Sequence, residues 1–151
     1  MRNCNTTCNL ASRLRRKTLG TAENKQLLQH IYEEIAKRNI QPLLDSMADD
    51  IQWTIIGTSV LSGVTHSKRE AIEKILKPLA EKLTDDPFIF KFGRLIAEGE
   101  YVVMEARGWI KTKSGKPYNN TYCFVCRIVD GKIKEMTDYI DTEVMTYALG
   151  E

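Results

Sequence analysis

The sequence contains few of the residues that metal sites and disulfide frameworks require. Of its 151 residues, 2 are histidine and 4 are cysteine. Cys123 and Cys126 would point to opposite faces of one strand, and Cys4 and Cys8 lie in a polar segment. No disulfide framework is therefore expected, and a reducing compartment is favoured. We expect no metal site either, because the histidines and cysteines have no four-ligand spacing.

Long hydrophobic runs and cofactor motifs are also missing. No window approaches the roughly 18 consecutive apolar residues of a membrane span, so we expect no membrane association. There is no glycine-rich phosphate loop and no nucleophile with a matching base, and hence we expect no cofactor. The composition, with 42% hydrophobic and 28% charged residues, is typical of one soluble domain with a substantial core.

The first 22 residues contain no acidic residue, and their basic residues are Arg2, Arg13, Arg15, Arg16 and Lys17. This composition is typical of a flexible basic extension or of an organellar import peptide, and a start codon placed too far upstream would also explain it. We therefore expect one domain over residues 23–151, in a cytoplasmic protein unless the extension directs import. All 20 acidic residues fall in that domain, and its negative net charge argues against nucleic acid as a partner.

Hydrophobic periodicity predicts that helices come first and the main sheet later. The expected helices cover about residues 23–38, 41–48 and 67–83, with a strand at 51–56, four strands at 87–97, 101–112, 118–129 and 132–140, and a short carboxy-terminal helix. This segregation of elements predicts an α+β fold, in which a cone-shaped, curved antiparallel sheet wraps around the amino-terminal helices.

The predicted hairpin of residues 118–142 contains an acidic residue, Asp138, among apolar and aromatic neighbours. A two-residue turn at Asp130-Gly131 would set Asp138 opposite Cys123. A three-residue loop ending in a left-handed bulge glycine would set it opposite Tyr122. We prefer the second register, because it gathers one acid and several large side chains on a single face, as in a ligand cavity. That face contains Asn120, Tyr122, Phe124, Met136, Asp138 and Ile140.

Asp138, Arg107 and Tyr122 are the predicted catalytic residues. A turn centred on Ser114-Gly115 would place Arg107 opposite Tyr122 on the cavity face, whereas a shift of one residue would place it outside. Beside a substrate oxygen held by Arg107 and Tyr122, Asp138 could exchange a proton at an adjacent carbon or activate water. The predicted ligand-binding residues are Trp53, Ile55, Asn120, Phe124, Met136 and Ile140.

A structural role is the competing interpretation of the same residues. Asp138 would then form an ion pair with Arg107 or Arg127, and the large side chains around it would be core residues only.

Several motifs together resemble a known family. They are Met-Ala-Asp-Asp at 47–50, the capping box that starts at Ser67, the spacing of Tyr118, Asn120 and Tyr122, Asp-Gly-Lys-Ile at 130–133, and Asp-Tyr-Ile-Asp-Thr at 138–142. Over about residues 23–149 the chain resembles the SnoaL-like (polyketide cyclase and ketosteroid isomerase-like) branch of the nuclear transport factor two superfamily. The resemblance implies a cone-shaped, cystatin-like α+β barrel that is often dimeric through the outer sheet face. Such domains include isomerases, hydrolases, cyclases and non-catalytic binding modules.

The resemblance can be tested against known active sites. Ketosteroid isomerases place polar catalytic groups at positions that match Ile55, Ile31 and approximately Phe124, so their mechanism is not expected here. The catalytic aspartate on the last strand of limonene-epoxide hydrolases matches Asp138. Their arginine and second aspartate, two residues apart, match Arg107 and Trp109, which breaks that triad.

SnoaL-type polyketide cyclases require fewer groups, and their acid/base aspartate matches Asp138. The resemblance thus implies acid/base catalysis, of the cyclase, isomerase or epoxide-hydrolase type, on a small apolar or aromatic ligand in a conical pocket. The alternatives are a non-catalytic ligand-binding or dimerisation module of the same fold, and an accessory partner in a larger complex. We expect a homodimer formed through the outer sheet face.

Overall fold

The computed structural model describes residues 20–150, so nearly all of the expected basic extension lies outside the described residues. The elements are α1 (Thr21–Ala36), α2 (Gln41–Ser46), β1 (Met47–Ile55), β2 (Gly63–Thr65), α3 (Lys68–Ala71), the π-helical turn η1 (Ile72–Leu76), α4 (Lys77–Lys82), β3 (Ile89–Glu98), β4 (Tyr101–Lys111), β5 (Pro117–Val129), β6 (Lys132–Ile140) and α5 (Thr142–Leu149). Every expected element is present within a few residues, and only the short strand β2 was not expected. Within this range, no helix has the length and hydrophobicity of a bilayer-crossing span.

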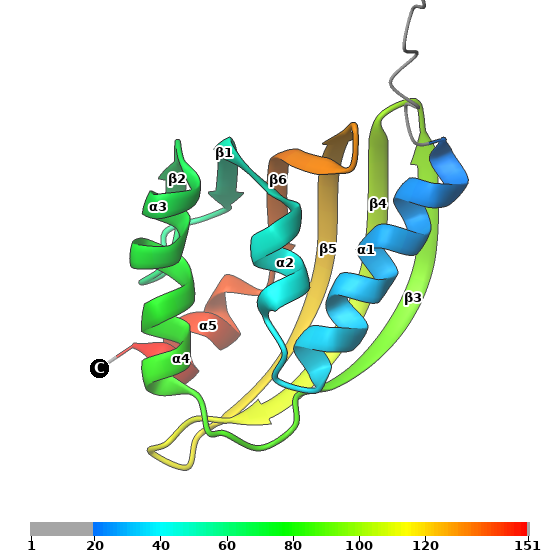
Figure 1. The fold of residues 1–151 in the computed structure, drawn as a ribbon. Coiled ribbons are helices and arrows are strands. Elements are labelled where there is room, and N and C mark those ends of the chain that lie inside the picture. Colours follow the sequence, from blue (N-terminus) through cyan, green and yellow to red (C-terminus); the bar gives the residue numbers. More distant parts are fainter. Residues whose placement is uncertain (1–19, 151) are drawn as a thin grey trace, which may run out of the picture.

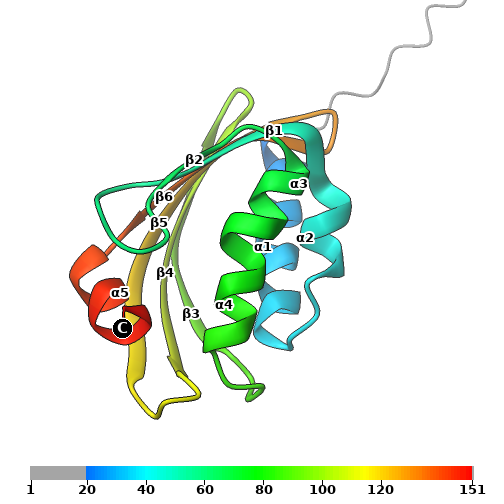
Figure 2. The same ribbon diagram turned by 90° about the vertical axis from the view of Figure 1, so that its left-hand side faces the viewer.

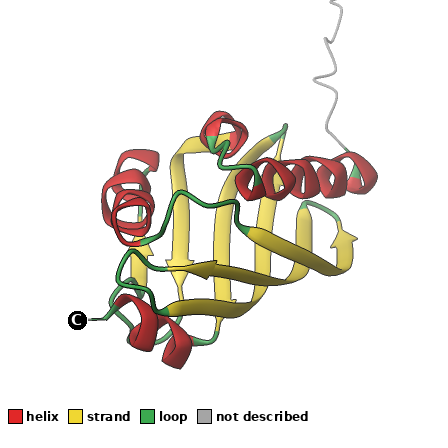
Figure 3. Ribbon diagram, turned by 90° about the horizontal axis from the view of Figure 1, so that it is seen from below, coloured by secondary structure: helices red, strands yellow, loops and turns green. Residues whose placement is uncertain are grey.

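The six strands form one sheet in the order β2-β1-β6-β5-β4-β3. Helices α1 and α2 lie against one face of this sheet (Figures 1 and 2), and the strands curve strongly when seen from below (Figure 3). The predicted α+β fold is confirmed. Two details of the prediction are wrong: β1 runs parallel to β6, so the sheet is mixed, and β2 and β3 remain separate edges, so the sheet is not closed as a barrel.

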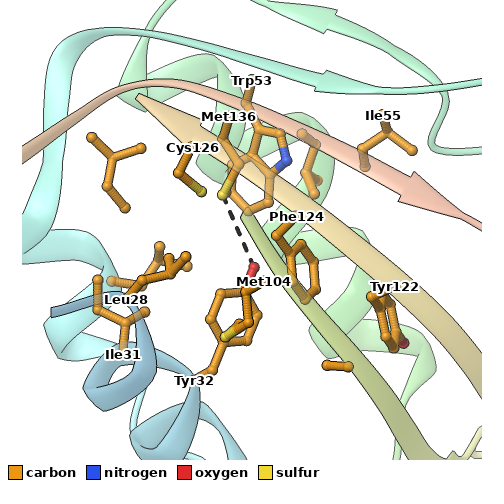
Figure 4. Close-up of a cluster of buried hydrophobic side chains, with 14 of the residues drawn as sticks. Leu28, Ile31, Tyr32, Trp53, Ile55, Met104, Tyr122, Phe124, Cys126 and Met136 are labelled. Carbon is orange, nitrogen blue, oxygen red and sulfur yellow. Dashed lines mark hydrogen bonds between the residues drawn. The ribbon is translucent and has the colours of Figure 1, made fainter. Parts of the chain in front are cut away.

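Helix α1 packs on the sheet through Leu28 and Ile31, which its apolar periodicity predicted, and through Tyr32, which it did not. Leu28 and Ile31 are fully buried and Tyr32 is 5% exposed, and all three point toward side chains of the sheet (Figure 4). Strand β1 contributes Ile51, Trp53 and Ile55 to the same interior, in agreement with the predicted alternation. Burial of such side chains stabilises the fold by about 1.5–3 kcal/mol each.

The long helical segment after β2 starts as its sequence predicted. Ser67 Oγ accepts a hydrogen bond from the Glu70 amide at 3.2 Å, and the Glu70 carboxylate accepts one from the His66 amide at 2.9 Å. These bonds satisfy amides at the helix start. The π-helical turn η1 precedes Pro78, which lacks an N–H group. Residues of η1 and α4 line the cavity described below.

The β5–β6 hairpin has a register that neither prediction anticipated. Its turn has two residues, Asp130 and Gly131, both with positive φ (50° and 74°), as a type I′ turn requires. Val129 then pairs with Lys132, but the register shifts by one residue at Lys134, and Asp138 lies opposite Phe124. The sequence did not predict this shift at Lys134. Asp138 lies opposite Phe124 and not opposite Tyr122 as in the preferred register, a displacement of two residues, so the same side chains still share the inner face.

Arg38 occupies an unusual position just beyond α1. Its φ is 65°, a left-handed conformation that glycine normally adopts at this place. The amides of Arg38 and Asn39 donate to the carbonyls of Ile35 and Glu34, both at 2.9 Å, which is the hydrogen-bond pattern of a Schellman motif. An arginine here costs free energy that a glycine would not, because its Cβ lies close to the backbone.

Replacement of Arg38 by glycine should therefore stabilise the protein. We expect Arg38→Gly to raise the free energy of unfolding by about 0.5–1 kcal/mol and Tm by about 2–4 °C. Thermal and urea unfolding would measure both. Lys37→Gly is the matched control, since Lys37 has a negative φ of −86° and glycine should destabilise the chain there. A lower Tm for Arg38→Gly would show that the side chain contributes more to stability than its backbone conformation costs.

Candidate functional site

A cavity of about 280 Å³ lies between the helices and the inner face of the sheet. Most of its wall is apolar or aromatic, and within residues 20–150 its only carboxylate is that of Asp138. The lining residues come from α1, α2, α4 and α5, from η1, from strands β1, β3, β5 and β6, and from the segments after α1 and α4, so the cavity exists only in the folded chain. They include Tyr32, Arg38, Trp53, Ile55, Leu79, Phe88, Phe90, Tyr118, Tyr122, Phe124, Asp138, Ile140 and Met145.

Asp138 lies in the middle of the sheet, between Ile55 of β1 and Phe124 of β5. The residue is 7% exposed. One carboxylate oxygen and the indole Nε1 of Trp53 are both buried, and neither has a hydrogen-bond partner within residues 20–150. Buried polar atoms are rarely left in this state, because each loses its bonds to water. Two such atoms in one cavity wall therefore indicate a place where a ligand or a water molecule would bind.

Burial raises the pKa of Asp138 from its ordinary value of 3.8 to about 7. Loss of hydration disfavours the charged form, and the nearby indole N–H of Trp53 lowers the pKa only in part. That N–H does not reach hydrogen-bonding geometry, so we regard it as a weak electrostatic neighbour of the carboxylate and not as its partner. At neutral pH both protonation states of Asp138 are populated, as a group that must accept and return a proton requires.

Aromatic rings form one wall of the cavity. The ring centroids of Tyr32 and Phe124 are 4.3 Å apart, and those of Tyr122 and Phe124 are 5.1 Å apart in a stacked arrangement. Phe90 continues this wall at 5.8 Å from Tyr122. Burial raises the pKa of both tyrosines, and the charge of Asp138 adds to this effect, so their hydroxyl groups stay protonated and can donate hydrogen bonds.

Sequence reasoning did not identify Tyr32 as a cavity residue. Its hydroxyl group points away from α1 toward Met136, with 4.0 Å between the oxygen and the sulfur (Figure 4). The spacing of four residues between Leu28 and Tyr32 places both on one side of the helix and could have revealed it. The sequence comparison matched Ile31 to a polar catalytic residue of the ketosteroid isomerases. In the structure the residue after it, Tyr32, is the one with a polar group in the cavity wall.

A glycine on β4 provides the space for this aromatic wall. A Cβ atom on Gly108 would lie 2.7 Å from the Phe88 ring and 3.1 Å from the Tyr122 ring. Both distances are too short for ordinary contact, so any larger residue at this position would displace the rings.

The structure brings together most of the predicted cavity residues. Asp138, Tyr122, Trp53, Ile55, Phe124 and Ile140 line the cavity. Asn120 and Met136 are buried on the same inner face of the sheet but are not among the residues that line the cavity. The Asn120 amide oxygen accepts from the Asp141 amide at 3.0 Å, and its nitrogen donates to the Asp141 carbonyl at 3.1 Å. Asn120 thus joins β5 to the start of α5, where the Asp141 side chain caps the helix by accepting from the amides of Glu143 and Val144.

Arg107 does not lie where the catalytic prediction requires it. It pairs with Thr121, is exposed, and projects from the outer face of the sheet, whereas Ala106 is the residue opposite Tyr122. The predicted alignment is wrong by one residue, and in a strand such a shift reverses the face. The structural interpretation of Asp138 is not supported either. Arg127 bonds to Glu100 and Glu135, both at 2.9 Å, and no ion pair involves Asp138 among the described residues.

A second and more open hollow of about 730 Å³ lies on the outer face of the sheet. Its lining includes Lys91, Glu105, Arg107, Trp109 and Tyr139. The carboxylate of Glu105 is held by Arg94 in two hydrogen bonds of 2.7 and 2.9 Å. We consider the inner cavity the candidate site, although it is smaller, because it alone contains the buried acid. Within residues 20–150, no three histidine, cysteine, aspartate or glutamate side chains are grouped as a metal site requires.

Comparison with known proteins agrees with this fold. The family model of the SnoaL-like domain matches residues 28–136. A nuclear transport factor two-like protein of unknown function from Burkholderia pseudomallei is 21% identical, with a TM-score of 0.73 over 85% of this chain and 98% of its own. No curated protein sequence gives a significant match.

Two further solved structures resemble the chain. TerC, which was co-crystallised with polyporic acid, is 20% identical with a TM-score of 0.70, over 85% of this chain and 98% of its own. An LEH-like epoxide hydrolase from M. tuberculosis is 19% identical with a TM-score of 0.67, over 85% of this chain and 90% of its own. At these identities the likeness establishes the fold alone.

The unpaired carboxyl group should make stability depend on pH. In the unfolded chain Asp138 loses its proton near pH 4, but in the folded chain only near pH 7, so its neutral form stabilises the fold at low pH. This contribution is lost as the pH rises through 7. We expect Asp138→Asn to match the wild type near pH 4 and to exceed it at pH 8, by as much as about 4 kcal/mol. Urea unfolding at both pH values would measure the difference.

Asp130→Asn, in an exposed turn, is the control and should show no such dependence on pH. Carboxyl carbon NMR of the wild type should show one aspartate that titrates near pH 7, and this signal should be missing from Asp138→Asn. If the Asp138→Asn protein were instead less stable than the wild type at pH 8, Asp138 would have a stabilising partner in the folded state.

Proposed function

The chain belongs to the SnoaL-like domain family, and on this premise we propose that it is a cofactor-independent enzyme that transfers protons on a small aromatic or apolar ligand in the inner cavity. Asp138 is the proposed acid/base. The observation that carries the proposal is the buried carboxyl group in the cavity wall, which has an oxygen without a hydrogen-bond partner among residues 20–150 and a pKa of about 7.

The surroundings of Asp138 support a role in proton transfer to and from carbon. The ionised carboxylate would take a proton from a carbon next to a carbonyl group. The indole N–H of Trp53, which has no partner among the described residues, would donate a hydrogen bond to the oxygen that gains charge. The protonated carboxyl group would then return the proton to another atom of the ligand, which completes an isomerisation or a ring closure without net loss of protons.

The aromatic wall supports the proposed class of ligand. Tyr32, Phe90, Tyr122 and Phe124 offer ring faces and edges to a planar compound, and such contacts contribute beyond simple burial. The volume of about 280 Å³ is at the small end of ligand pockets. Proteins of this fold include polyketide cyclases, isomerases and epoxide hydrolases, and one of them was co-crystallised with polyporic acid.

The charged groups of the cavity favour the cyclase or isomerase type over the epoxide-hydrolase type. Asp138 is its only carboxylate, and Arg107 faces away from it. The pair of an arginine and a second aspartate two residues apart, which the resemblance to limonene-epoxide hydrolases would require, is therefore absent from the described cavity wall, whose one arginine is Arg38. The second candidate function is that of a non-catalytic binding module, because one acid and several aromatic rings would also suffice to hold a ligand.

A ligand screen with wild type and Asp138→Asn separates enzyme from binding module. The panel contains polyporic acid and representative aromatic polyketides, epoxides, steroids and terpenoids. We expect one class to raise Tm of both proteins. With that class, turnover followed by liquid chromatography and mass spectrometry should fall at least about 100-fold in the variant, because the acid/base group is lost.

Asp130→Asn is the control for the screen and should retain full turnover. Binding by both proteins without turnover by either would identify a binding module. Equal turnover by wild type and Asp138→Asn would remove Asp138 from the mechanism.

We also propose that the protein is a homodimer formed through the outer face of the sheet. Tyr139 on this face is 49% exposed, and it borders the outer hollow together with Trp109 and Arg107. Aromatic and arginine side chains are typical of the centres of protein interfaces. A second copy of the chain would bury these side chains and leave the inner cavity unchanged.

The dimer can be tested by a charge placed on that face. We expect multi-angle light scattering to give about twice the monomer mass of 17.3 kDa for the wild type, and a shift toward monomer for Tyr139→Asp. Tyr147→Asp is the control, since Tyr147 is 60% exposed on α5 but does not line the outer hollow. A monomeric wild type at high micromolar concentration would contradict the dimer.

A further inference from the structure

The inner cavity opens to solvent at the end where α1 and α4 finish. Most of its lining is buried, but Ile40 is 40% exposed, Ala80 is exposed, and the Arg38 side chain is 30% exposed. Helices α1 and α4 both end at this end of the molecule (Figures 1 and 2). Asp138 and Trp53 are buried, and we call this buried polar part of the wall the closed end; the solvent-exposed part, which includes the cationic side chain of Arg38, is called the mouth.

The guanidinium group of Arg38 is free to bind a ligand. The nearest carboxylate is that of Asp85, whose oxygen lies 4.0 Å from the Arg38 nitrogen, beyond hydrogen-bonding distance. The Asp85 side chain is 95% exposed, so its attraction is weakened by water. Within residues 20–150, the guanidinium donates no hydrogen bond, although it carries five N–H groups in a planar fork that suits a carboxylate.

The backbone of Arg38 adds a second observation. The residue has the left-handed conformation that usually belongs to glycine, and this conformation fixes where the side chain leaves the chain. The Ala36 carbonyl, two residues earlier, accepts a hydrogen bond of 3.0 Å from the Phe88 amide, which ties this segment to another part of the cavity wall. Strained residues held in this way are concentrated at ligand sites, where the strain positions a functional group.

We propose that Arg38 binds an anionic group, of the carboxylate type, on the ligand of the inner cavity. This inference rests on the proposed function and specifies its substrate class: a planar apolar or aromatic body with an anionic group at one end and an oxygen atom at the other. The anionic group lies at the mouth and pairs with the guanidinium. The apolar body lies against the aromatic wall, and the oxygen accepts from Trp53 at the closed end.

This arrangement also orients the ligand. An anionic group would be repelled by the ionised carboxylate of Asp138 at the closed end and attracted by Arg38 at the mouth, so the ligand enters in one direction only. The reacting carbon, near the oxygen, is then presented to Asp138. Arg38 is in this sense a specificity-determining residue that does not touch the reacting atoms.

The test compares one aromatic acid with its neutral analogue, para-phenylbenzoic acid with para-phenylbenzamide, by titration calorimetry at pH 8. We expect the wild type to bind the acid about tenfold more tightly than the amide, because a guanidinium fork pairs with a carboxylate but not with an amide. In Arg38→Gln and Arg38→Gly this preference should disappear, while affinity for the amide should stay within about twofold. Asp85→Asn is the control and should keep or strengthen the preference.

The two arginine variants separate the effect of the lost charge from an effect of altered folding. Arg38→Gln retains the strained backbone and Arg38→Gly relieves it, so a loss of preference in both follows from the lost charge and not from altered folding. A wild type that binds acid and amide equally, or an unchanged preference in Arg38→Gln, overturns the inference and leaves the proposed function intact. Binding of neither compound by the wild type overturns both the inference and the aromatic ligand class.

Discussion

The register of the β5–β6 hairpin is the constraint on which the rest of the site depends. The type I′ turn at Asp130-Gly131 alone would set Asp138 opposite Cys123 and turn it toward solvent. The extra residue at Lys134 moves every later side chain of β6 by one position, and Asp138 then faces the interior opposite Phe124. The buried acid and the position of Met136 against Tyr32 both follow from this irregularity.

The site is a compromise between stability and chemical usefulness. A carboxyl group placed among apolar side chains without a partner is unfavourable, and the protein would be more stable without it at neutral pH. The same desolvation brings the pKa of Asp138 into the neutral range, where it can exchange protons. Arg38 is a second example, since its backbone conformation costs free energy while its guanidinium donates no hydrogen bond within residues 20–150. The two polar ends of the cavity are thus its least stabilising parts.

The two faces of the sheet divide their roles by alternation along each strand. On β4 and β5, residues with even numbers contact the helices or line the cavity, and those with odd numbers form the outer face. Arg107 and Tyr122 belong to opposite sets, which excludes the cluster that the sequence had predicted. Gly108 belongs to the inner set, and its lack of a side chain leaves room for Phe88 and Tyr122. A single-residue difference in pairing therefore decides whether a charged residue serves the cavity or the exterior.

The sequence by itself determined the α+β class, the boundaries of most elements, and the grouping of Tyr122 with Phe124 on one face. These features depend on local periodicity, on turn residues and on the parity of side chains along a strand, all of which are visible in one segment at a time. Only the tertiary structure decided the parallel pairing of β1 with β6, the outward direction of Arg107, the contribution of Tyr32 and the position of Arg38 at the mouth. Each of these depends on how segments distant in sequence pack together, and no local pattern specifies that packing, because many pairings bury similar apolar area.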